Sequence, residues 1–316
     1  MITGKKLRRY LWLYCTLLLL GASSPAITAQ SSTSQAITNS STTPLQTTTP
    51  TFTADVATNE KTLHIVTQPL EVSAQAHEIY FYQLLELALE KTRATHGPYK
   101  LERLKRILSN QRYIAEVSRD DGIIDITWTM IDEEREKKLL PIKISLLRGM
   151  NSYRVFLIRQ EDKEKFRAVN TLEDLKKFNA GSGSVWPDTS ILQNNGLPVV
   201  TSAHYELLFT MLQRKRFDYF PRGVYEVWTE QKAHADKGFI IEDSLMFHYP
   251  APIYFFVNKN NTRLAERIER GLQIAIEDGS FEQLFFSTPG FEQGYKEIHN
   301  PNRRILRLNA LNHYDD

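Results

Sequence analysis

The chain has 316 residues, of which 39 are Lys or Arg and 37 are Asp or Glu, so that its formal net charge is +2. This balance excludes the strongly basic surface on which nucleic-acid binding depends, and we expect no nucleic-acid partner. The single cysteine, Cys15, excludes an intramolecular disulfide framework and a zinc site built from several thiolates.

Residues 1–29 have the composition of a secretory signal. An apolar run at Leu11–Leu20 is followed by small residues that end at Ala29, and the basic residues before it are Lys5, Lys6, Arg8 and Arg9. The run is shorter than the about 20 apolar residues that span a bilayer, so we expect cleavage and export to the periplasm, with a retained anchor as the alternative. Cys15 follows Tyr14 rather than a small residue, which argues against a lipid anchor.

The segment after this signal is rich in hydroxyl side chains. Between residues 31 and 59, 15 of the 29 positions are Ser or Thr. Such a segment buries too little apolar surface to offset its ordering entropy, and we predict a disordered linker over residues 30–60. The signal holds four of the 39 basic residues and none of the 37 acidic ones, so the chain after it has a formal charge of −2 and no cysteine.

The folded part then alternates strands with helices. A strand is predicted at Leu63–Val66, and apolar residues that recur at helical spacing between Phe81 and Leu89 predict a helix. Runs rich in β-branched and aromatic residues predict two more strands, at Ile123–Met130 and Tyr153–Arg159.

The second half continues this pattern. A helix is predicted at Thr171–Phe178, with Thr171 as its N-cap and Asp174 as the acid of a capping box. Further strands are expected at Ser184–Trp186, Val199–Thr201, Phe217–Phe220 and Ile253–Asn258. A long amphipathic helix covers Leu264–Ile276, and Ser280 is expected to cap a short helix after it. Strands alternating with such helices predict an α/β fold with mostly parallel sheets.

Short motifs occur in a characteristic order along the folded part: Asp132–Lys137, Asn151–Phe156, Thr171–Leu175, Trp186–Thr189, Arg216–Gly223 and Asp278–Phe281. In the protein family that this order resembles, the first motif has as its counterpart a Thr-Pro-Glu-Arg segment followed by basic residues. The counterpart of the second motif is a strand that crosses into a second lobe, and that of the third is the start of a helix. Together they cover residues 61 to about 300. In this order the chain resembles the extracellular solute-binding proteins of family 3, the receptors of polar amino acid ABC transporters, and one branch of that family in particular.

The resemblance implies a two-lobed periplasmic binding protein type II fold. Each lobe would be a mostly parallel sheet flanked by helices, with two crossing strands as the hinge. Lobe one is expected at residues 61–152 and again at 253–316, and lobe two at 153–252. The resemblance further implies that a ligand binds in a pocket between the lobes and that the lobes close around it by a hinge motion.

Arg135 is the first candidate ligand-binding residue, because the resemblance places here the arginine that forks onto the α-carboxylate of an amino acid. Hydrogen bonds to a charged group contribute about 1.5 to 3 kcal/mol each. The alternative is a solvated arginine in a charged helix start, between Glu134 and Glu136. Asp132 stands where the family has Thr, which leaves the identity of the ligand open.

Arg222 is the second candidate, and it departs from the family, which often has an acid here that binds the amino group of the ligand. An arginine cannot hold an ammonium group. The ligand is therefore expected to be an anion, unless Glu226 or Asp188 binds its ammonium group instead. A structural ion pair is the alternative role for Arg222.

The other candidate ligand-binding residues are Trp128, Trp186, Asp188 and Tyr205. Trp128 and Trp186 would stack on a ligand from opposite lobes, or else belong to the core. Asp188 follows a strand-to-helix turn, where it would cap the helix and leave free N–H groups facing an anion. Tyr205, at a helix start, is an aromatic candidate of the same kind.

Signatures of catalysis and of cofactor binding are few. The segment Gly181-Ser182-Gly183-Ser184 lacks the glycine spacing of a nucleophile elbow, and neither a phosphate-binding loop nor a dinucleotide fingerprint occurs. The eight histidines never fall at metal-ligand spacing. We therefore expect no enzyme, no cofactor and no metal. A hydrolase that works with two carboxylates stays open, because the fold sets their separation.

The sequence thus predicts a monomeric solute-binding protein of the periplasm. It would capture a small polar ligand, anionic or amino-acid-like, for an inner-membrane ABC permease. A binding protein that signals in trans to a membrane receptor is the alternative of the same class, and the sequence does not separate the two.

Overall fold

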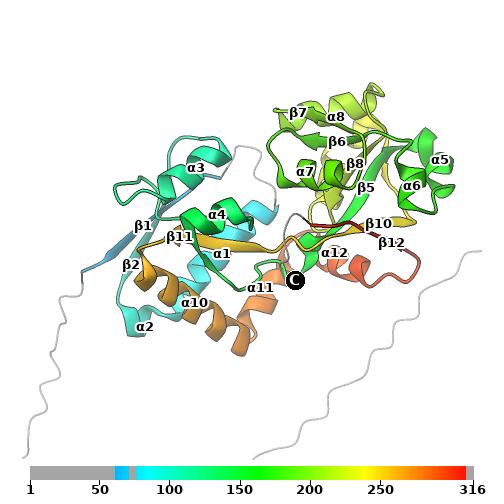
Figure 1. Ribbon diagram of the computed structural model, residues 1–316. Helices are drawn as coiled ribbons and strands as arrows, with labels where there is room; N and C mark the ends of the chain where they lie inside the picture. Colours follow the sequence, from blue (N-terminus) through cyan, green and yellow to red (C-terminus); the bar gives the residue numbers. More distant parts are fainter. Residues whose placement is uncertain (1–60, 71–75, 311–316) are drawn as a thin grey trace, which may run out of the picture. The chain divides into compact units, whose positions relative to one another are not determined.

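The computed structural model describes residues 61–70 and 76–310, which form two β-sheets with helices packed on them (Figure 1). The predicted signal at 1–29 and the predicted linker at 30–60 lie outside the described residues. Within the described part, no helix has both the length and the apolar character that crossing a bilayer requires.

The first sheet has five strands: β1 (Leu63–Thr67), β2 (Tyr99–Arg103), β3 (Ile126–Met130), β4 (Leu139–Ile142) and β11 (Ile253–Asn258). Their order is β2-β1-β3-β11-β4. Strand β1 is parallel to β2 and β3, whereas β11 is antiparallel to β3 and β4. The first sheet is therefore built from two parts of the chain that are far apart in sequence.

The second sheet has seven strands: β5 (Tyr153–Arg159), β6 (Ala180–Gly183), β7 (Val199–Ser202), β8 (Tyr219–Gly223), β9 (Phe239–Ile241), β10 (Leu245–His248) and β12 (Arg304–Arg307). Their order is β12-β10-β5-β8-β6-β7, and β9 also pairs with β5. Strand β6 is parallel to β7 and β8, and β5 is antiparallel to β8, β9 and β10.

The helices connect and cover these strands: α1 (Ala76–Lys91), α2 (Arg93–His96), α3 (Asn110–Val117), α4 (Glu133–Lys138), α5 (Lys163–Arg167), α6 (Leu172–Leu175), α7 (Pro187–Asn194), α8 (Tyr205–Gln213), α9 (Val227–Ala233), α10 (Thr262–Glu277), α11 (Ser280–Ser287) and α12 (Phe291–Ile298). The predicted long amphipathic helix is α10. The short helix after it starts differently from the prediction, because Gly279, with φ of 79°, holds the N-cap position and Ser280 is already helical.

The two faces of the first sheet carry different helices (Figure 1). Neighbouring side chains of a strand point to opposite faces, so Phe255 and Phe256 of β11 belong to different hydrophobic clusters. Phe255 packs in the cluster of α1 and α10, and Phe256 packs in the cluster of α3. The first lobe is accordingly a three-layered unit of helix, sheet and helix.

Two predicted strands are displaced in the structure. The strand predicted at Ser184–Trp186 is wrong, because the strand is β6 and residues 184–186 form the turn that leads into α7. The residues of β6 are Ala, Gly and Ser, which have low strand propensity. Gly181 is required there, since a Cβ atom on it would lie 2.3 Å from the ring of Phe217. The strand predicted at Phe217–Phe220 starts two residues later, as β8.

The last described strand, β12, joins the second sheet, whereas the sequence assigned residues 253–316 to lobe one. Strand β12 pairs in parallel with β10, with Leu245 opposite Arg304. Arg303 is buried just before this strand, where it donates hydrogen bonds to the carbonyl oxygens of Glu242 and Leu245, each at 2.7 Å. These contacts hold the terminal segment against the second sheet rather than the first.

Candidate ligand-binding site

The interlobe pocket is a cavity of about 320 Å³ lined by side chains from the elements of both sheets. The first lobe, built around the first sheet, contributes His77, Glu78, Phe81 and Trp128. The second lobe contributes Arg154, Trp186, Asp188, Tyr205, Arg222, Tyr225 and Glu226. Strand β3 ends at this pocket and helices α7 and α8 begin there, so the pocket lies at the carboxyl ends of strands, where open α/β sheets bind ligands.

Arg222 lies at the second-lobe side of the pocket, 7% exposed, with its guanidinium group occupied by two carboxylates. Its Nε and Nη2 donate to Glu230 at 2.8 and 2.6 Å, and Nη2 lies 3.0 Å from Oε1 of Glu226. The guanidinium carbon is 5.0 Å from the ring centre of Trp186 and 4.8 Å from that of Phe220. The structural ion pair considered for Arg222 is therefore present, inside the predicted pocket.

The two glutamates that share Arg222 differ in protonation. Burial raises the pKa of Glu226 to about 7, because its contact with Arg222 offsets only part of the desolvation. Burial also acts on Glu230, but the two-pronged contact with Arg222 and the hydroxyl of Tyr205, at 2.6 Å, outweigh it and lower the pKa of Glu230. Glu226 therefore changes its charge near neutral pH, while Glu230 stays ionised.

Asp188 is part of a second buried ion pair. Its Oδ1 accepts from Nε of Arg154 at 2.9 Å and from the hydroxyl of Tyr249 at 2.5 Å, and Arg154 also donates to the carbonyl oxygen of Asn151. Burial would raise the pKa of Asp188, but Arg154 outweighs burial and lowers it. The prediction that Asp188 caps its helix is wrong, because Trp186 holds the N-cap position of α7.

The two predicted tryptophans line the same pocket from different lobes. Trp128 of β3 is 5% exposed and donates from Nε1 to Glu78 at 3.1 Å. Trp186 stacks on Phe220 with an interplanar angle of 10°. Tyr205 opens α8 and lies beside Trp186, with 6.3 Å between the ring centres. Each ring is thus partly core and partly pocket wall, and its contact with a ligand stays a prediction.

Arg135 lines an adjacent cavity of about 590 Å³, which shares Trp186 and Pro187 with the interlobe pocket. Its Nη1 donates to the carbonyl oxygen of Met130 at 2.6 Å and lies 3.1 Å from Asp132. The alternative of a solvated arginine is wrong, because the side chain is only 12% exposed. Its Nε is buried without a hydrogen-bond partner, and burial lowers the pKa of this guanidinium group.

Comparison of the sequence with protein-family models finds no match, and comparison with curated protein sequences finds none either. Solved structures do match. An ancestral arginine-binding protein bound to arginine is 16% identical, with a TM-score of 0.53 over 72% of this chain and 98% of that one.

Two further structures match equally well. A Salmonella typhimurium periplasmic binding protein with high arginine specificity is 16% identical, with a TM-score of 0.52 over 72% of this chain and 99% of that one. An amino acid ABC transporter substrate-binding protein from Streptococcus pneumoniae, bound to L-arginine, is 13% identical, with a TM-score of 0.52 over 74% and 95% of the two chains. The chain has the periplasmic binding protein type II fold.

Five residues of this periplasmic binding protein type II fold line or support the interlobe pocket, although sequence patterns did not single them out. They are His77, Glu78, Arg154, Tyr225 and Tyr249. One of them left a signal, since Arg154 is a charged residue in a strand whose other inner positions are apolar. The remaining ones lie at a helix start or in connecting segments, where polar side chains are ordinary and carry no pattern.

Proposed function

We propose that this chain is a monomeric periplasmic solute-binding protein whose lobes close on one small amino-acid-like ligand, without changing it chemically, for an inner-membrane ABC permease. The observation that carries the proposal is that both lobes line one pocket and that each places a tryptophan in it. A site that neither lobe completes alone is what hinge closure around a ligand requires. The fold shared with amino-acid-binding structures supports it.

The proposed ligand carries a cationic group, which departs from the anion expected from the sequence. Apart from a histidine, the pocket wall has three acidic side chains and two basic ones. The acidic ones are Glu78, Asp188 and Glu226, and the basic ones are Arg154 and Arg222. Both guanidinium groups already hold internal carboxylates, and burial lowers the pKa of His77, so that its ring is neutral. Asp188 neutralises Arg154 and Glu230 neutralises Arg222, so Glu78, together with Glu226 above about pH 7, leaves the pocket wall negative. The aromatic rings add cation–π attraction for an ammonium or guanidinium group.

Arg135 is the proposed partner of the carboxylate of the ligand. Buried polar atoms without a hydrogen-bond partner are few in folded proteins, and Nε of Arg135 is one of them. Its cavity adjoins the interlobe pocket at Trp186 and Pro187. A zwitterionic ligand would thus place its carboxylate toward Arg135 and its cationic group toward Asp188 and the face of Trp186.

A thermal-shift screen of the purified chain tests this ligand class. Binding to the folded state raises its stability by about 2.7 kcal/mol when the ligand is at 100 times its Kd. We expect amino acids to raise the Tm and simple dicarboxylates to leave it unchanged. If dicarboxylates stabilise the protein and no compound with an ammonium or guanidinium group does, the proposed ligand class is wrong.

Arg135→Ala tests the role of Arg135 with any ligand that the screen identifies. We expect affinity to fall at least roughly tenfold, as loss of one hydrogen-bonded charge pair implies. The matched control is Lys137→Ala on the same helix, whose side chain is 64% exposed and outside that cavity, and whose ion-pair partner Glu134 is also at the surface. Calorimetric titration gives both affinities, and equal affinity in Arg135→Ala and the parent would remove the assignment.

A further inference from the structure

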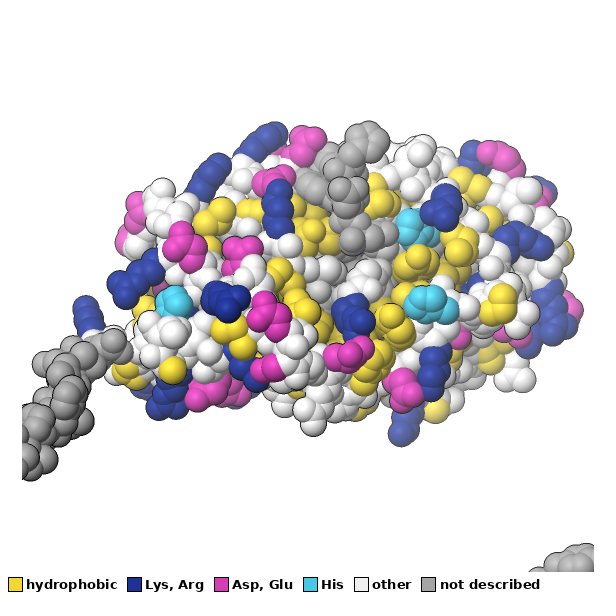
Figure 2. Space-filling model, turned by 90° about the horizontal axis from the view of Figure 1, so that it is seen from below, with side chains coloured by type: hydrophobic (Ala, Val, Ile, Leu, Met, Phe, Trp, Pro, Cys, Tyr) yellow, Lys and Arg dark blue, Asp and Glu magenta, His cyan; other side chains and the backbone are white. Residues whose placement is uncertain are grey.

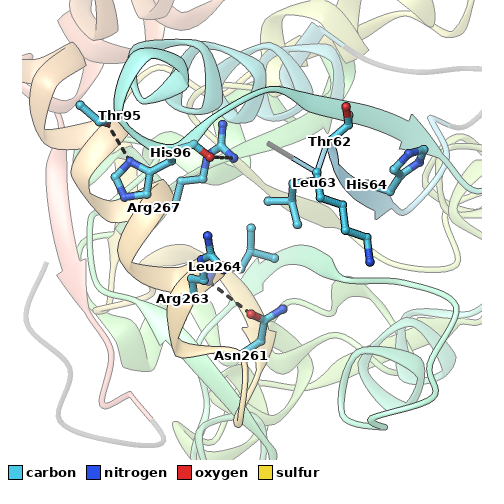
Figure 3. Close-up of a pocket in the computed structure, with 10 residues that line it drawn as sticks. Thr62, Leu63, His64, Thr95, His96, Asn261, Arg263, Leu264 and Arg267 are labelled. Atoms are coloured by element: carbon cyan, nitrogen blue, oxygen red, sulfur yellow. Dashed lines mark hydrogen bonds between the residues drawn. The ribbon is translucent and has the colours of Figure 1, made fainter. Parts of the chain in front are cut away.

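The first lobe contains a second cavity, of about 660 Å³, that shares no lining residue with the interlobe pocket. It lies at the amino end of β1, between the end of α2 and the first turn of α10 (Figure 3). Its basic side chains are Lys61, His64, His96, Arg263 and Arg267, and we call it the basic pocket. The interlobe pocket lies at the opposite, carboxyl end of the strands, so the two cavities are separate sites.

None of the described residues that line the basic pocket is an Asp or a Glu. Among the described residues, no ion pair compensates Lys61 or Arg263, and both side chains are exposed. Lys100 lies opposite His64 on β2, where it holds Glu102 at 2.8 Å. The face drawn in Figure 2 carries acidic and basic side chains side by side around apolar patches.

The first turn of α10 adds to the positive charge at the basic pocket. Helix N-termini favour acidic side chains because the first N–H groups carry partial positive charge. The first turn of α10 contains no acid and instead carries Arg263. Asn261 accepts from the N–H of Leu264 at 3.3 Å, which leaves the N–H groups of Thr262 and Arg263 without an intrahelical partner. A departure from the preference for acidic side chains at a helix N-terminus, like other departures from local preferences, is typical of functional sites.

Arg267 fixes the wall of the basic pocket. The residue is 2% exposed, and its guanidinium group donates to the carbonyl oxygen of His96 at 3.2 Å (Figure 3). It also donates to the carbonyl oxygen of Gly97 at 2.8 Å and to the hydroxyl of Thr92. These bonds tie α10 to the end of α2. The positions of Arg263 and His96 relative to each other are therefore set by buried contacts before any ligand arrives.

We propose that the basic pocket binds the phosphoryl group of a phosphate ester. Cations from two elements and the N–H groups of a helix start converge there from different directions, which suits a tetrahedral dianion better than the planar carboxylate that one arginine fork holds. The volume of about 660 Å³ leaves room for an organic part beside the phosphoryl group. Either a soluble ester or a phospholipid headgroup supplies this chemistry.

Calorimetric titration with glycerol 3-phosphate, with citrate as the carboxylate comparison, tests the proposal in solution. Sedimentation with phosphatidylcholine vesicles, with and without phosphatidic acid, tests the lipid source. The variant is Lys61→Ala/Arg263→Ala, whose positions are exposed, so that its Tm should match that of the parent. The control is Arg270→Ala, on α10 but outside the pocket, where the side chain is 53% exposed and pairs with Glu277.

We expect the double variant to bind the phosphate compound at least roughly tenfold more weakly, and Arg270→Ala to stay within about twofold of the parent. Binding of the soluble ester or of phosphatidic acid alone names the source and supports the site in either case. The proposal is overturned if neither binds, if citrate binds as tightly, or if the double variant equals the parent. Arg135→Ala should leave this binding unchanged, which separates the basic pocket from the proposed interlobe function.

Discussion

Arg222, in the wall of the interlobe pocket, lies within hydrogen-bond distance of both Glu226 and Glu230. Desolvation of buried charges is costly, and apolar replacements of such clusters are often at least as stable. Stability alone therefore does not explain the cluster. Its position beside Trp186 and Tyr205 fits the proposed role, in which it holds the aromatic wall and the negative charge that a cationic ligand meets.

Glu226→Gln is expected to change how stability depends on pH. The folded state keeps the proton of Glu226 up to about pH 7, whereas an ordinary glutamate releases it near 4.5. The stability that this proton contributes is fully present below the ordinary pKa and is lost as the pH rises through about 7. The variant has no such loss, so its free energy of unfolding relative to the parent should rise with pH.

Urea unfolding of both proteins between about pH 5 and about pH 8 measures this difference. Glutamine resembles the protonated carboxyl group, so the two proteins should be close in stability at the acidic end. Parallel stability curves across the whole range would contradict the raised pKa of Glu226.

At the scale of elements, α1 and α10 cross at a point where only glycine fits. A Cβ atom on Gly271 of α10 would lie 2.0 Å from the carbonyl oxygen of Ala88 in α1. The flanking residues Ile268, Leu272 and Ala275 are buried against the same cluster as Leu84 and Leu85. The close approach therefore brings two apolar helix faces into contact beneath the first sheet.

Gly271→Ala is expected to destabilise the protein by about 2 kcal/mol. Alanine favours the helix by about 1 kcal/mol over glycine, but forcing a methyl group into a packed contact with backbone costs more than that. Chemical denaturation measures the change. Gln273→Ala, at an exposed position of the same helix, is the control and should be near neutral. A stabilised Gly271→Ala protein would show that the two helices separate easily.

For the whole molecule, the largest cluster of buried apolar residues contains side chains of both lobes. It includes Ile126 and Phe255 of the first sheet together with Val155, Leu157 and Phe220 of the second. Loss of either part exposes apolar surface of the other. The two lobes are consequently coupled in folding even though the interlobe pocket lies between them.

We expect one cooperative unfolding transition in the absence of ligand. Trp128 reports on the first lobe and Trp186 and Trp228 report on the second, while far-ultraviolet circular dichroism reports on both. Coincident midpoints of tryptophan fluorescence and circular dichroism are the test of two-state behaviour. Two separated transitions would show that the lobes unfold independently, and a Trp128→Phe protein, whose tryptophans in the described residues all lie in the second lobe, would then identify which lobe melts first.

Local patterns in the sequence determined those helices and strands whose capping residues and apolar spacing lie within a few residues of one another in the chain. Thr171 and Asp174 form the predicted capping box, with Asp174 N–H bound to Thr171 Oγ1 at 3.2 Å and Thr171 N–H bound to Asp174 Oδ2 at 3.0 Å. Periodicity likewise determined α10, and the order of the motifs determined the fold. Helical spacing and capping act through neighbouring residues, so they can be read without the structure.

Only the tertiary structure decided which charges meet and where the last strand lies. Arg154 and Asp188 are 34 positions apart, and no local pattern joins them. Strand β6 is built from small residues, and the packing of Phe217 against Gly181 and of Trp186 against Gly183 explains it. Strand β12 belongs to the second sheet because the buried Arg303 donates to the carbonyl groups of Glu242, before β10, and of Leu245, its first residue. These outcomes depend on burial and long-range pairing, which exist only once the chain has folded.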